Sequence, residues 1–195
     1  QMYRDMPPIV AKMYAIPYDV FEIDDYQAKY YAIMRIALSE DVRSVFTANP
    51  SSILKMCEKA NEFAETIIAD TRDGTLSRNF SMDPGIRRTL EANLTPDPER
   101  AKELEQMRDK RGGKLVPGDY WPNLDLIGCW KGGTVGHYLK HFPDWFDPDG
   151  NKPVPVRDWG YLSSEARGSI PISEEGSRGV LTVATNVFEF VQVDD

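Results

Sequence analysis

Apolar side chains recur at helical spacing in two long stretches of the first half of the chain. Over 24–38 they fall three and four positions apart, and Asp24 is placed to cap the start of a helix. A second apolar stripe begins after Asn49-Pro50, a capping residue followed by a first-turn proline, and continues to Gly74. A short β-branched and aromatic run, 42–46, lies between them. This order of helix, strand and helix predicts one face of an α/β sheet.

The region between the second stripe and residue 113 is polar. Asp83-Pro84 and Asp97-Pro98 each put a capping carboxylate before a first-turn proline, so they predict two surface helices. The second helix is expected over about 98–110. Its charged side chains are typical of a solvated face and predict no chemistry.

Short apolar runs alternate with small-residue loops after Trp121. The runs 124–130 and 154–157 predict two short strands, the first of them buried. Residues 180–193, rich in Val and Phe, predict two strands or one long interrupted strand. These patterns divide the chain into a mainly helical part with one short strand, 14–116, and a strand-rich part, 117–195.

Two further expectations concern helix ends and the core. Thr134 is placed to cap a short helix that Pro143 would end. The apolar positions of the predicted elements predict four core residues: Phe63, Ile67, Ile127 and Trp130.

Composition narrows the classes of partner. The 195 residues carry a net charge of -8 with no long Lys/Arg stripe, which argues against nucleic acid. No apolar run approaches the roughly 18 to 20 residues that a membrane span needs. Cys57 and Cys129 lie in apolar stretches, as buried free thiols do in a reducing compartment. We expect a cytoplasmic protein with neither nucleic-acid nor membrane partners.

The loop Gly132-Gly133-Thr134, which follows a predicted strand, is one candidate for chemistry. In open α/β sheets ligands collect outside the carboxyl ends of the strands. Glycines let backbone N–H groups approach a ligand closely, so this loop suits an anion or a purine edge. The alternative is an ordinary strand-to-helix turn that needs glycine for its dihedral angles.

The segment Tyr161-Leu162-Ser163-Ser164-Glu165 is the second candidate. It groups an aromatic ring that can stack on a base, two hydroxyls that can bond phosphate oxygens, and a carboxylate that can hold Mg²⁺. The alternative is a serine-rich turn with a half-buried tyrosine. His137 and His141 are four apart, but the chain has no third histidine, so a histidine metal site is not favoured.

Four elements in this order form a recognisable set: Trp121-Pro122-Asn123-Leu124, Trp130-Lys131-Gly132-Gly133, Tyr161 to Glu165, and Phe188-Glu189-Phe190. Their order and spacing resemble the auxin-responsive Gretchen Hagen family of acyl acid amido synthetases, in the adenylate-forming superfamily of the luciferases. The likeness covers about 14–193. The fold it implies is α/β: residues 1–195 would be an internal portion of the mixed-sheet N-terminal adenylating domain.

The resemblance also implies a reaction and a set of roles. A carboxylic acid would be activated with ATP and Mg²⁺ as an acyl-adenylate and transferred to the amine of an amino acid. By this likeness Ser164 and Glu165 would be catalytic, with Glu165 the Mg²⁺ ligand. ATP would be bound by the residues Tyr161, Ser163, Ser164, Gly132, Gly133 and Thr134.

Some parts of the family pattern are not found. The Ser/Thr/Gly-rich phosphate loop is expected upstream of Tyr14, and the ribose-binding element and C-terminal domain beyond Val193. We therefore expect the 195 residues alone to be inactive, with the rest of the domain and the C-terminal domain as partners. Ala166-Arg167 stands where plant members carry larger aromatic residues, which favours a bacterial relative. Two alternatives remain: an acyl-CoA ligase of the same superfamily, and a non-catalytic interaction module.

Overall fold

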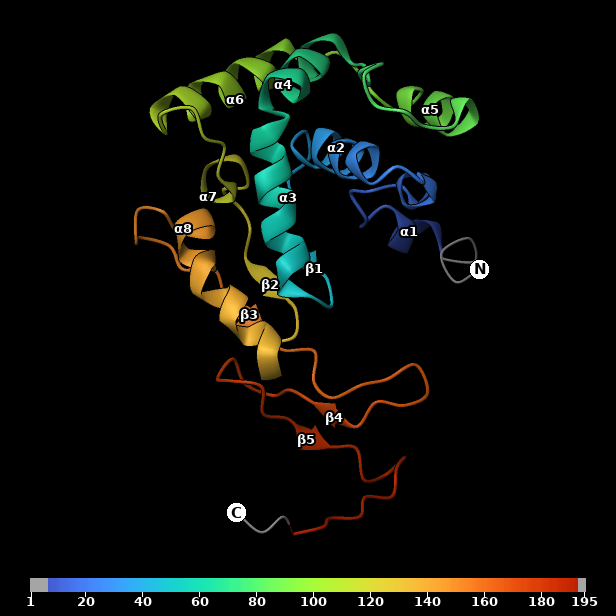
Figure 1. Ribbon diagram of the computed structural model, residues 1–195, viewed down its shortest axis with the longest axis vertical. Helices are drawn as coiled ribbons and strands as arrows, with labels where there is room; N and C mark the ends of the chain where they lie inside the picture. The colour runs from blue at the N-terminus through green and yellow to red at the C-terminus, as the bar shows by residue number, and fades with distance from the viewer. Residues whose placement is uncertain (1–6, 193–195) are drawn as a thin grey trace.

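A computed structural model describes residues 7–192, and the side chains of Pro8 and Ala11 are left out of the description. Helices gather at one end of the molecule, a three-stranded sheet lies beside the long helix at its middle, and a two-stranded ribbon lies toward the C-terminus (Figure 1). The elements are, in order, α1 (Pro8–Ala11), η1 (Tyr18–Glu22), α2 (Tyr26–Ala37), β1 (Ser44–Phe46), α3 (Pro50–Glu62), α4 (Ala64–Asp73), α5 (Pro84–Glu91), α6 (Pro98–Lys110), α7 (Pro117–Tyr120), β2 (Leu126–Gly128), η2 (Gly133–His141), α8 (Phe142–Phe146), β3 (Val156–Arg157), β4 (Ser169–Ile170) and β5 (Val180–Leu181).

Side-chain caps start four of the helices. Asn49, Asp83 and Asp97 accept backbone N–H bonds at the starts of α3, α5 and α6, as predicted. The cap of α2 was predicted one residue too early. Asp25, and not Asp24, accepts the Ala28 N–H at 2.6 Å. The exact capping residue follows from backbone direction, which two adjacent aspartates do not distinguish in sequence.

The second apolar stripe forms two helices, where one was predicted. Phe63 leaves the helical conformation with φ -104° and ψ 13°, and α4 restarts at Ala64. Its ring packs edge-on against Tyr31 and Phe80, at centroid distances of 6.3 and 4.9 Å. Helical spacing continues through the break, so the pattern of apolar residues does not reveal it. Gly74 ends α4 in the left-handed region, as expected.

The core lies among the helices and against the sheet. Ile67 and Ile127 are fully buried, as predicted. Phe63 is half-buried and packs against the core, whereas Trp130 is half-buried outside it, so the core prediction was wrong for Trp130. Phe63 lies at the break between α3 and α4, and Trp130 lies beyond the end of β2. Both thiols are buried and free, as the sequence indicated.

A buried polar network fixes the loop that follows α4. The Tyr31 hydroxyl donates to Asp70 Oδ2 at 2.5 Å and accepts the Ser77 N–H at 2.8 Å. Arg35, 1% exposed, donates to the carbonyl oxygens of Asp70 and Thr75. Burial raises the pKa of Tyr31 and lowers that of Arg35. Buried side chains therefore hold the backbone of this loop.

Strands β1, β2 and β3 form a parallel sheet in that order, with Ser44 paired to Leu126 and Ile127 to Val156. Each strand is shorter than its apolar run. The Trp121 indole donates to the Ala37 carbonyl at 2.9 Å and joins the start of the sheet region to α2. Parallel order places all three carboxyl ends at one edge.

The segment after β2 differs from its prediction. Residue 132 is the cap position of η2 and makes no side-chain bond, while Thr134 lies inside η2. Pro143 lies in the first turn of α8 and does not end a helix. Proline fits a first turn because its missing N–H has no partner there. The chain therefore bends at 141–142, from a 3-10 helix into an α-helix.

The C-terminal part forms far less sheet than predicted. Ser169–Ile170 pairs antiparallel with Val180–Leu181, and 182–192 contains no strand. Residue 193 lies outside the described residues. Thr182 and Asn186 bond to each other and to the Arg167 carbonyl. Val and Phe favour strands only when a neighbouring strand and a covering layer are present, and here most of them remain exposed. Within 7–192 no helix combines the length and apolarity needed to cross a bilayer.

Candidate functional site

Three loops meet at the carboxyl edge of the parallel sheet. The Thr47 N–H donates to the Gly128 carbonyl at 3.0 Å, and the Trp130 N–H to the Ala48 carbonyl at 2.9 Å. The Cys129 N–H donates to the Arg157 carbonyl at 3.1 Å. Residues 47–48, 129–131 and 157–161 are thus joined by backbone bonds. Both candidate loops of the sequence leave from this edge.

Asp158 directly follows β3 at this edge, and sequence reasoning did not single it out. It is 6% exposed, and its two oxygens accept the N–H groups of Lys131 at 2.6 Å and Gly160 at 2.5 Å. Its negative charge and burial raise the pKa of the neighbouring Cys129 thiol, burial being the larger cause, to about 11. An aspartate directly after a predicted strand and two residues before a glycine was the available signal.

The loop Gly132-Gly133-Thr134 lies partly open to solvent. Gly133 has φ +61°, and a Cβ there would meet no atom within 4 Å. Only its conformation therefore requires glycine. At Gly132 a Cβ would lie 3.0 Å from the Ser177 hydroxyl, so this loop approaches the one that follows β4. Thr134 is exposed, and its carbonyl lies 2.5 Å from His137 Nδ1.

Tyr161 to Glu165 form one arm and the tip of a tight turn. Leu162 and Arg167 are bridged antiparallel, and the Ser163 N–H donates to the Ala166 carbonyl at 2.8 Å. Ser163, Ser164 and Glu165 are all exposed at the tip. This is a serine-rich turn, but its tyrosine is 77% exposed and not half-buried. Its polar groups therefore face solvent.

Contacts with β4 fix the base of this turn. The Tyr161 N–H donates to the Ser169 hydroxyl at 2.9 Å, and the Tyr161 carbonyl accepts the N–H groups of Gly168 and Ser169. A Cβ at Gly168 would lie 2.4 Å from the Tyr161 ring. Because residue 168 has no side chain, the ring can lie directly against its backbone.

The Glu165 carboxylate is the acidic group at the tip. Hydrogen bonding from the Ser163 hydroxyl, followed by the Glu165 backbone, lowers its pKa. The carboxylate is therefore ionised at neutral pH. Its side chain is also exposed to solvent. Among residues 7–192, no three His, Cys, Asp or Glu side chains are grouped closely enough to hold a metal by themselves.

A cleft of about 100 Å³ lies at the opposite, amino end of the strands. Trp121, Leu124 and Val154 contribute apolar walls, and Arg111 pairs there with Asp119 and Asp149 at 2.7 Å. None of the predicted site residues lines this cleft. The candidate loops and the cleft are separate features.

Comparison with known proteins decides the family. The sequence matches the GH3 family N-terminal domain over residues 1–150. This chain belongs to the GH3 family. GH3 is the auxin-responsive Gretchen Hagen family that the sequence resembles, so that resemblance is confirmed.

Among curated relatives, this GH3 chain is 27% identical over 184 residues to "Jasmonoyl--L-amino acid synthetase GH3.5" of Oryza sativa subsp. japonica. That match covers 90% of this chain and 30% of the relative. The structure is similar to "GH3.15 acyl acid amido synthetase", with a TM-score of 0.67 and 20% identity over 84% of this chain and 29% of that one.

A second solved structure, "AtGH3.15 acyl acid amido synthetase in complex with 2,4-DB", matches with a TM-score of 0.63 and 19% identity over 79% of this chain and 26% of that one. The α/β fold predicted from the sequence is confirmed. The chain spans under a third of the length of each relative. Tyr161 to Glu165 lie beyond the 1–150 match, so their roles remain predictions.

Proposed function

We propose that residues 1–195 contribute the nucleotide-binding loops of an ATP-dependent ligase that joins a carboxylic acid to an amino acid. One observation carries this proposal in a GH3 chain: Gly132 to Thr134 and Tyr161 to Glu165 leave adjacent parallel strands at the same edge, and one buried carboxylate joins their starting residues. Ligands of α/β sheets bind at such an edge.

The exposed groups of both loops can each bind one part of ATP. The open face of Tyr161 can stack on adenine, while the Ser164 hydroxyl can donate to a phosphate oxygen. The Ser163 hydroxyl can do the same once its proton turns away from the Glu165 carboxylate. Gly132, Gly133 and Thr134 would border the adenine and the acyl group with backbone. In this assignment Ser164 and Glu165 contact the reacting phosphate region.

Glu165 suits a magnesium ligand. Mg²⁺ is usually held by one or two carboxylates together with substrate phosphates and water, so a lone ionised carboxylate at an exposed tip fits it. When bound, Mg²⁺ would neutralise the negative charge that develops on the phosphates. Glu165 itself would orient the phosphates through that contact.

The names of the relatives support the acid and amine substrates. One is called a jasmonoyl–amino acid synthetase and another an acyl acid amido synthetase. In the proposed reaction the acid's carboxylate attacks the α-phosphorus of ATP and pyrophosphate leaves. The amine then attacks the acyl carbon and AMP leaves. Because the relatives form amides, their names favour this over the acyl-CoA ligase alternative.

The proposal also names the partners of this chain and its location in the cell. The phosphate loop and closing domain of a whole GH3 protein would complete the site around these loops. We place the reaction in the cytoplasm, where the buried thiols Cys57 and Cys129 would remain reduced.

Replacing Glu165 tests the proposal. In a full-length GH3 protein carrying these 195 residues, Glu165→Ala should lower ATP–pyrophosphate exchange by about 100-fold or more, since charge stabilisation in the transition state is lost. The melting temperature should not change, because the side chain is exposed. Exposed Glu175, on the loop after β4, supplies the matched control Glu175→Ala. Exchange near the unsubstituted level in Glu165→Ala over a range of Mg²⁺ concentrations would contradict the metal assignment.

A further inference from the structure

The Asp158 carboxylate makes a bond to the start of each candidate loop. Its Oδ2 accepts the N–H of Lys131, the residue before Gly132. Its Oδ1 accepts the N–H of Gly160, the residue before Tyr161. The side chain is 6% exposed, so water competes little for either bond. One group therefore connects two loops that lie 27 or more residues apart in sequence.

We propose that Asp158 is a positioning residue that holds the two nucleotide loops in fixed relation to each other. This inference rests on the proposed function, because it assigns both loops to one nucleotide. Asp158 would not contact ATP itself. It would act through the backbone of Lys131 and Gly160, and so reduce the loop motion that nucleotide binding must otherwise suppress.

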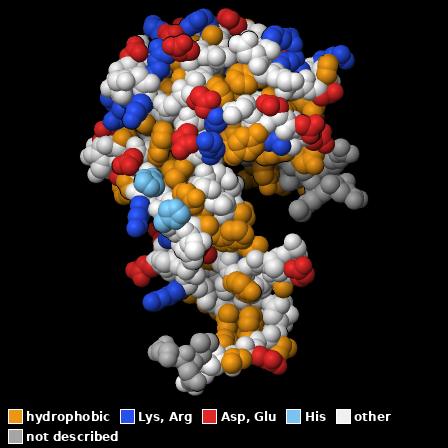
Figure 2. Space-filling model, in the orientation of Figure 1, with side chains coloured by type: hydrophobic (Ala, Val, Ile, Leu, Met, Phe, Trp, Pro, Cys, Tyr) orange, Lys and Arg blue, Asp and Glu red, His pale blue; other side chains and the backbone are white. Residues whose placement is uncertain are grey.

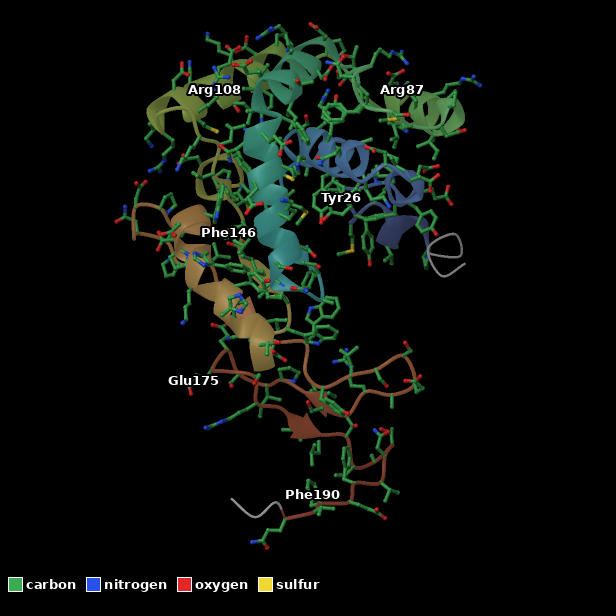
Figure 3. All side chains as sticks on the ribbon, viewed as in Figure 1. Tyr26, Arg87, Arg108, Phe146, Glu175 and Phe190 are labelled. Atoms are coloured by element: carbon green, nitrogen blue, oxygen red, sulfur yellow. The ribbon has the colours of Figure 1, made fainter. Side chains whose placement is uncertain are left out.

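Neighbouring contacts make the link stiff on both sides. The Lys131 ammonium donates to the Val156 carbonyl at 2.9 Å and also to the Glu174 carbonyl, which brings in the loop after β4. Glu175, the next residue of that loop, is labelled in Figure 3. Gly160 has φ +80°, and a Cβ there would lie 2.5 Å from the Ser169 carbonyl oxygen. The backbone at both bonded N–H groups thus has little freedom to move independently.

The chemistry of the link specifies a carboxylate. An ionised carboxylate only accepts hydrogen bonds, and it has two oxygens. An asparagine side chain has one oxygen that accepts and one amide NH2 group that only donates. Asp158→Asn therefore leaves one buried backbone N–H facing another donor, whereas Asp158→Ala removes the acceptors of both N–H groups.

Asp147 provides a matched control. Its Oδ1 accepts the N–H groups of Asn151 and Lys152 at 2.7 and 2.8 Å. It is also a loop aspartate that bonds two backbone donors, but it lines the cleft at the amino end of the strands. Asp147→Ala, like Asp158→Ala, removes the acceptor of two backbone N–H groups, and it does so away from the candidate loops.

Hydrogen exchange of the 195-residue chain, followed by NMR, tests the link. Asp158→Ala, which removes both acceptor oxygens, should speed exchange of the Lys131 and Gly160 amides by about tenfold each, the effect of losing one buried hydrogen bond at each amide. Ala166 and Gly168, beyond the tip of the Tyr161 turn, should exchange faster with them. Asp147→Ala should change only the amides near 151–152.

Binding of AMP supplies the functional readout. In a full-length GH3 protein carrying these 195 residues, the dissociation constant of AMP should rise about tenfold in Asp158→Ala and stay unchanged in Asp147→Ala, at equal loss of melting temperature. Faster exchange in only one of the two loops of the 195-residue Asp158→Ala chain would overturn the inference. Coupled exchange of the two loops, together with no AMP binding by the full-length protein, would support the link between the loops and overturn the nucleotide assignment.

The unsubstituted chain offers a test that does not depend on the folding of a variant. The amides of Lys131 and Gly160 share one acceptor group, so their protection factors should agree within about threefold. A difference of more than about tenfold would mean that the loops open independently, and would overturn the inference.

Discussion

The helical part of the molecule buries most of its large apolar side chains, whereas the segment 161–192 leaves most of its own exposed. In α2 to α6 the apolar stripes meet one another, and Tyr31, Ile67 and Leu104 are fully buried. In the C-terminal segment Ile172 and Val187 are 73% and 94% exposed. Figure 2 shows the contrast as charged side chains over the helices and apolar surface along the lower segment.

The difference reflects how each part is stabilised. Several helices can cover one another, whereas a two-stranded ribbon has no layer to bury its faces and is marginal in water. The ribbon β4–β5 is held mainly by polar bonds, among them those of Thr182 and Asn186 to the Arg167 carbonyl. The stability of the helical part therefore comes from its core, while the candidate turn depends on a thin polar scaffold.

The largest contrast is expected from two isoleucine substitutions. Ile67→Ala should lower the free energy of unfolding by about 2–5 kcal/mol, because it opens a cavity in the core. Ile172→Ala should change it by less than about 0.5 kcal/mol, since that side chain is exposed. Urea unfolding measures both. Equal losses would mean that the C-terminal segment is as well packed as the helices.

Two glycine substitutions in the helical part separate steric clash from backbone conformation. Gly74 and Gly112 have φ +68° and +65°, so alanine should cost about 1–2 kcal/mol at either position. At Gly74 a Cβ would lie 2.4 Å from Pro96 N, whereas at Gly112 it would meet nothing. Gly74→Ala should therefore cost a further 1–3 kcal/mol or so. Similar unfolding curves for the two variants would contradict this packing of α4 against residues 95–96.

Cys129, between the two parts in sequence, makes a pH-dependent contribution to the free energy of unfolding. Burial, followed by the Asp158 charge, raises the pKa of Cys129 from 9.0 to about 11, so the folded chain keeps the thiol proton that the unfolded chain loses. Its contribution to stability is fully present below pH 9 and is lost as pH rises towards 11. The slope is at most about 1.4 kcal/mol per pH unit. Urea unfolding at pH 8 and 10 should show a smaller loss in Cys129→Ala, and parallel losses would refute the burial of this thiol.

The most local effect is expected in the ribbon. Asn186→Ala removes an amide that donates to the Arg167 carbonyl at 2.9 Å and to the Thr182 hydroxyl at 2.6 Å. The local cost should be about 0.5–1.5 kcal/mol. Faster exchange of the Gly168 and Thr182 amides should report it, with the melting temperature of the helical part unchanged. A cooperative loss of the whole fold would show that ribbon and helices form one unit.

Local chemistry determined which elements could be predicted. The pairs Asn49-Pro50, Asp83-Pro84 and Asp97-Pro98 carry both cap and first-turn signals, and each starts a helix as predicted. The break at Phe63 follows from packing against distant rings, which spacing does not encode. Strands of two or three residues likewise depend on partners far away in sequence, so the limits of β3 to β5 could not be predicted.

The candidate site could likewise be predicted only in part from the sequence. The small-residue loop at Gly132 and the Tyr161 turn are visible in sequence because their residue types are unusual together. Asp158 is a single aspartate whose importance comes from where the Lys131 N–H lies. Only the pairing of β2 with β3 brings these two together.

The order of the parallel sheet also bears on how the chain reaches its fold. Ser44 pairs directly with Leu126, with α3 to α7 between them in sequence. Closing so long a loop is entropically costly until the intervening helices have shortened it, so β1 and β2 are expected to join late and slowly. The edge that carries both candidate loops would then be among the last features to form, after the helices have already collapsed around Ile67.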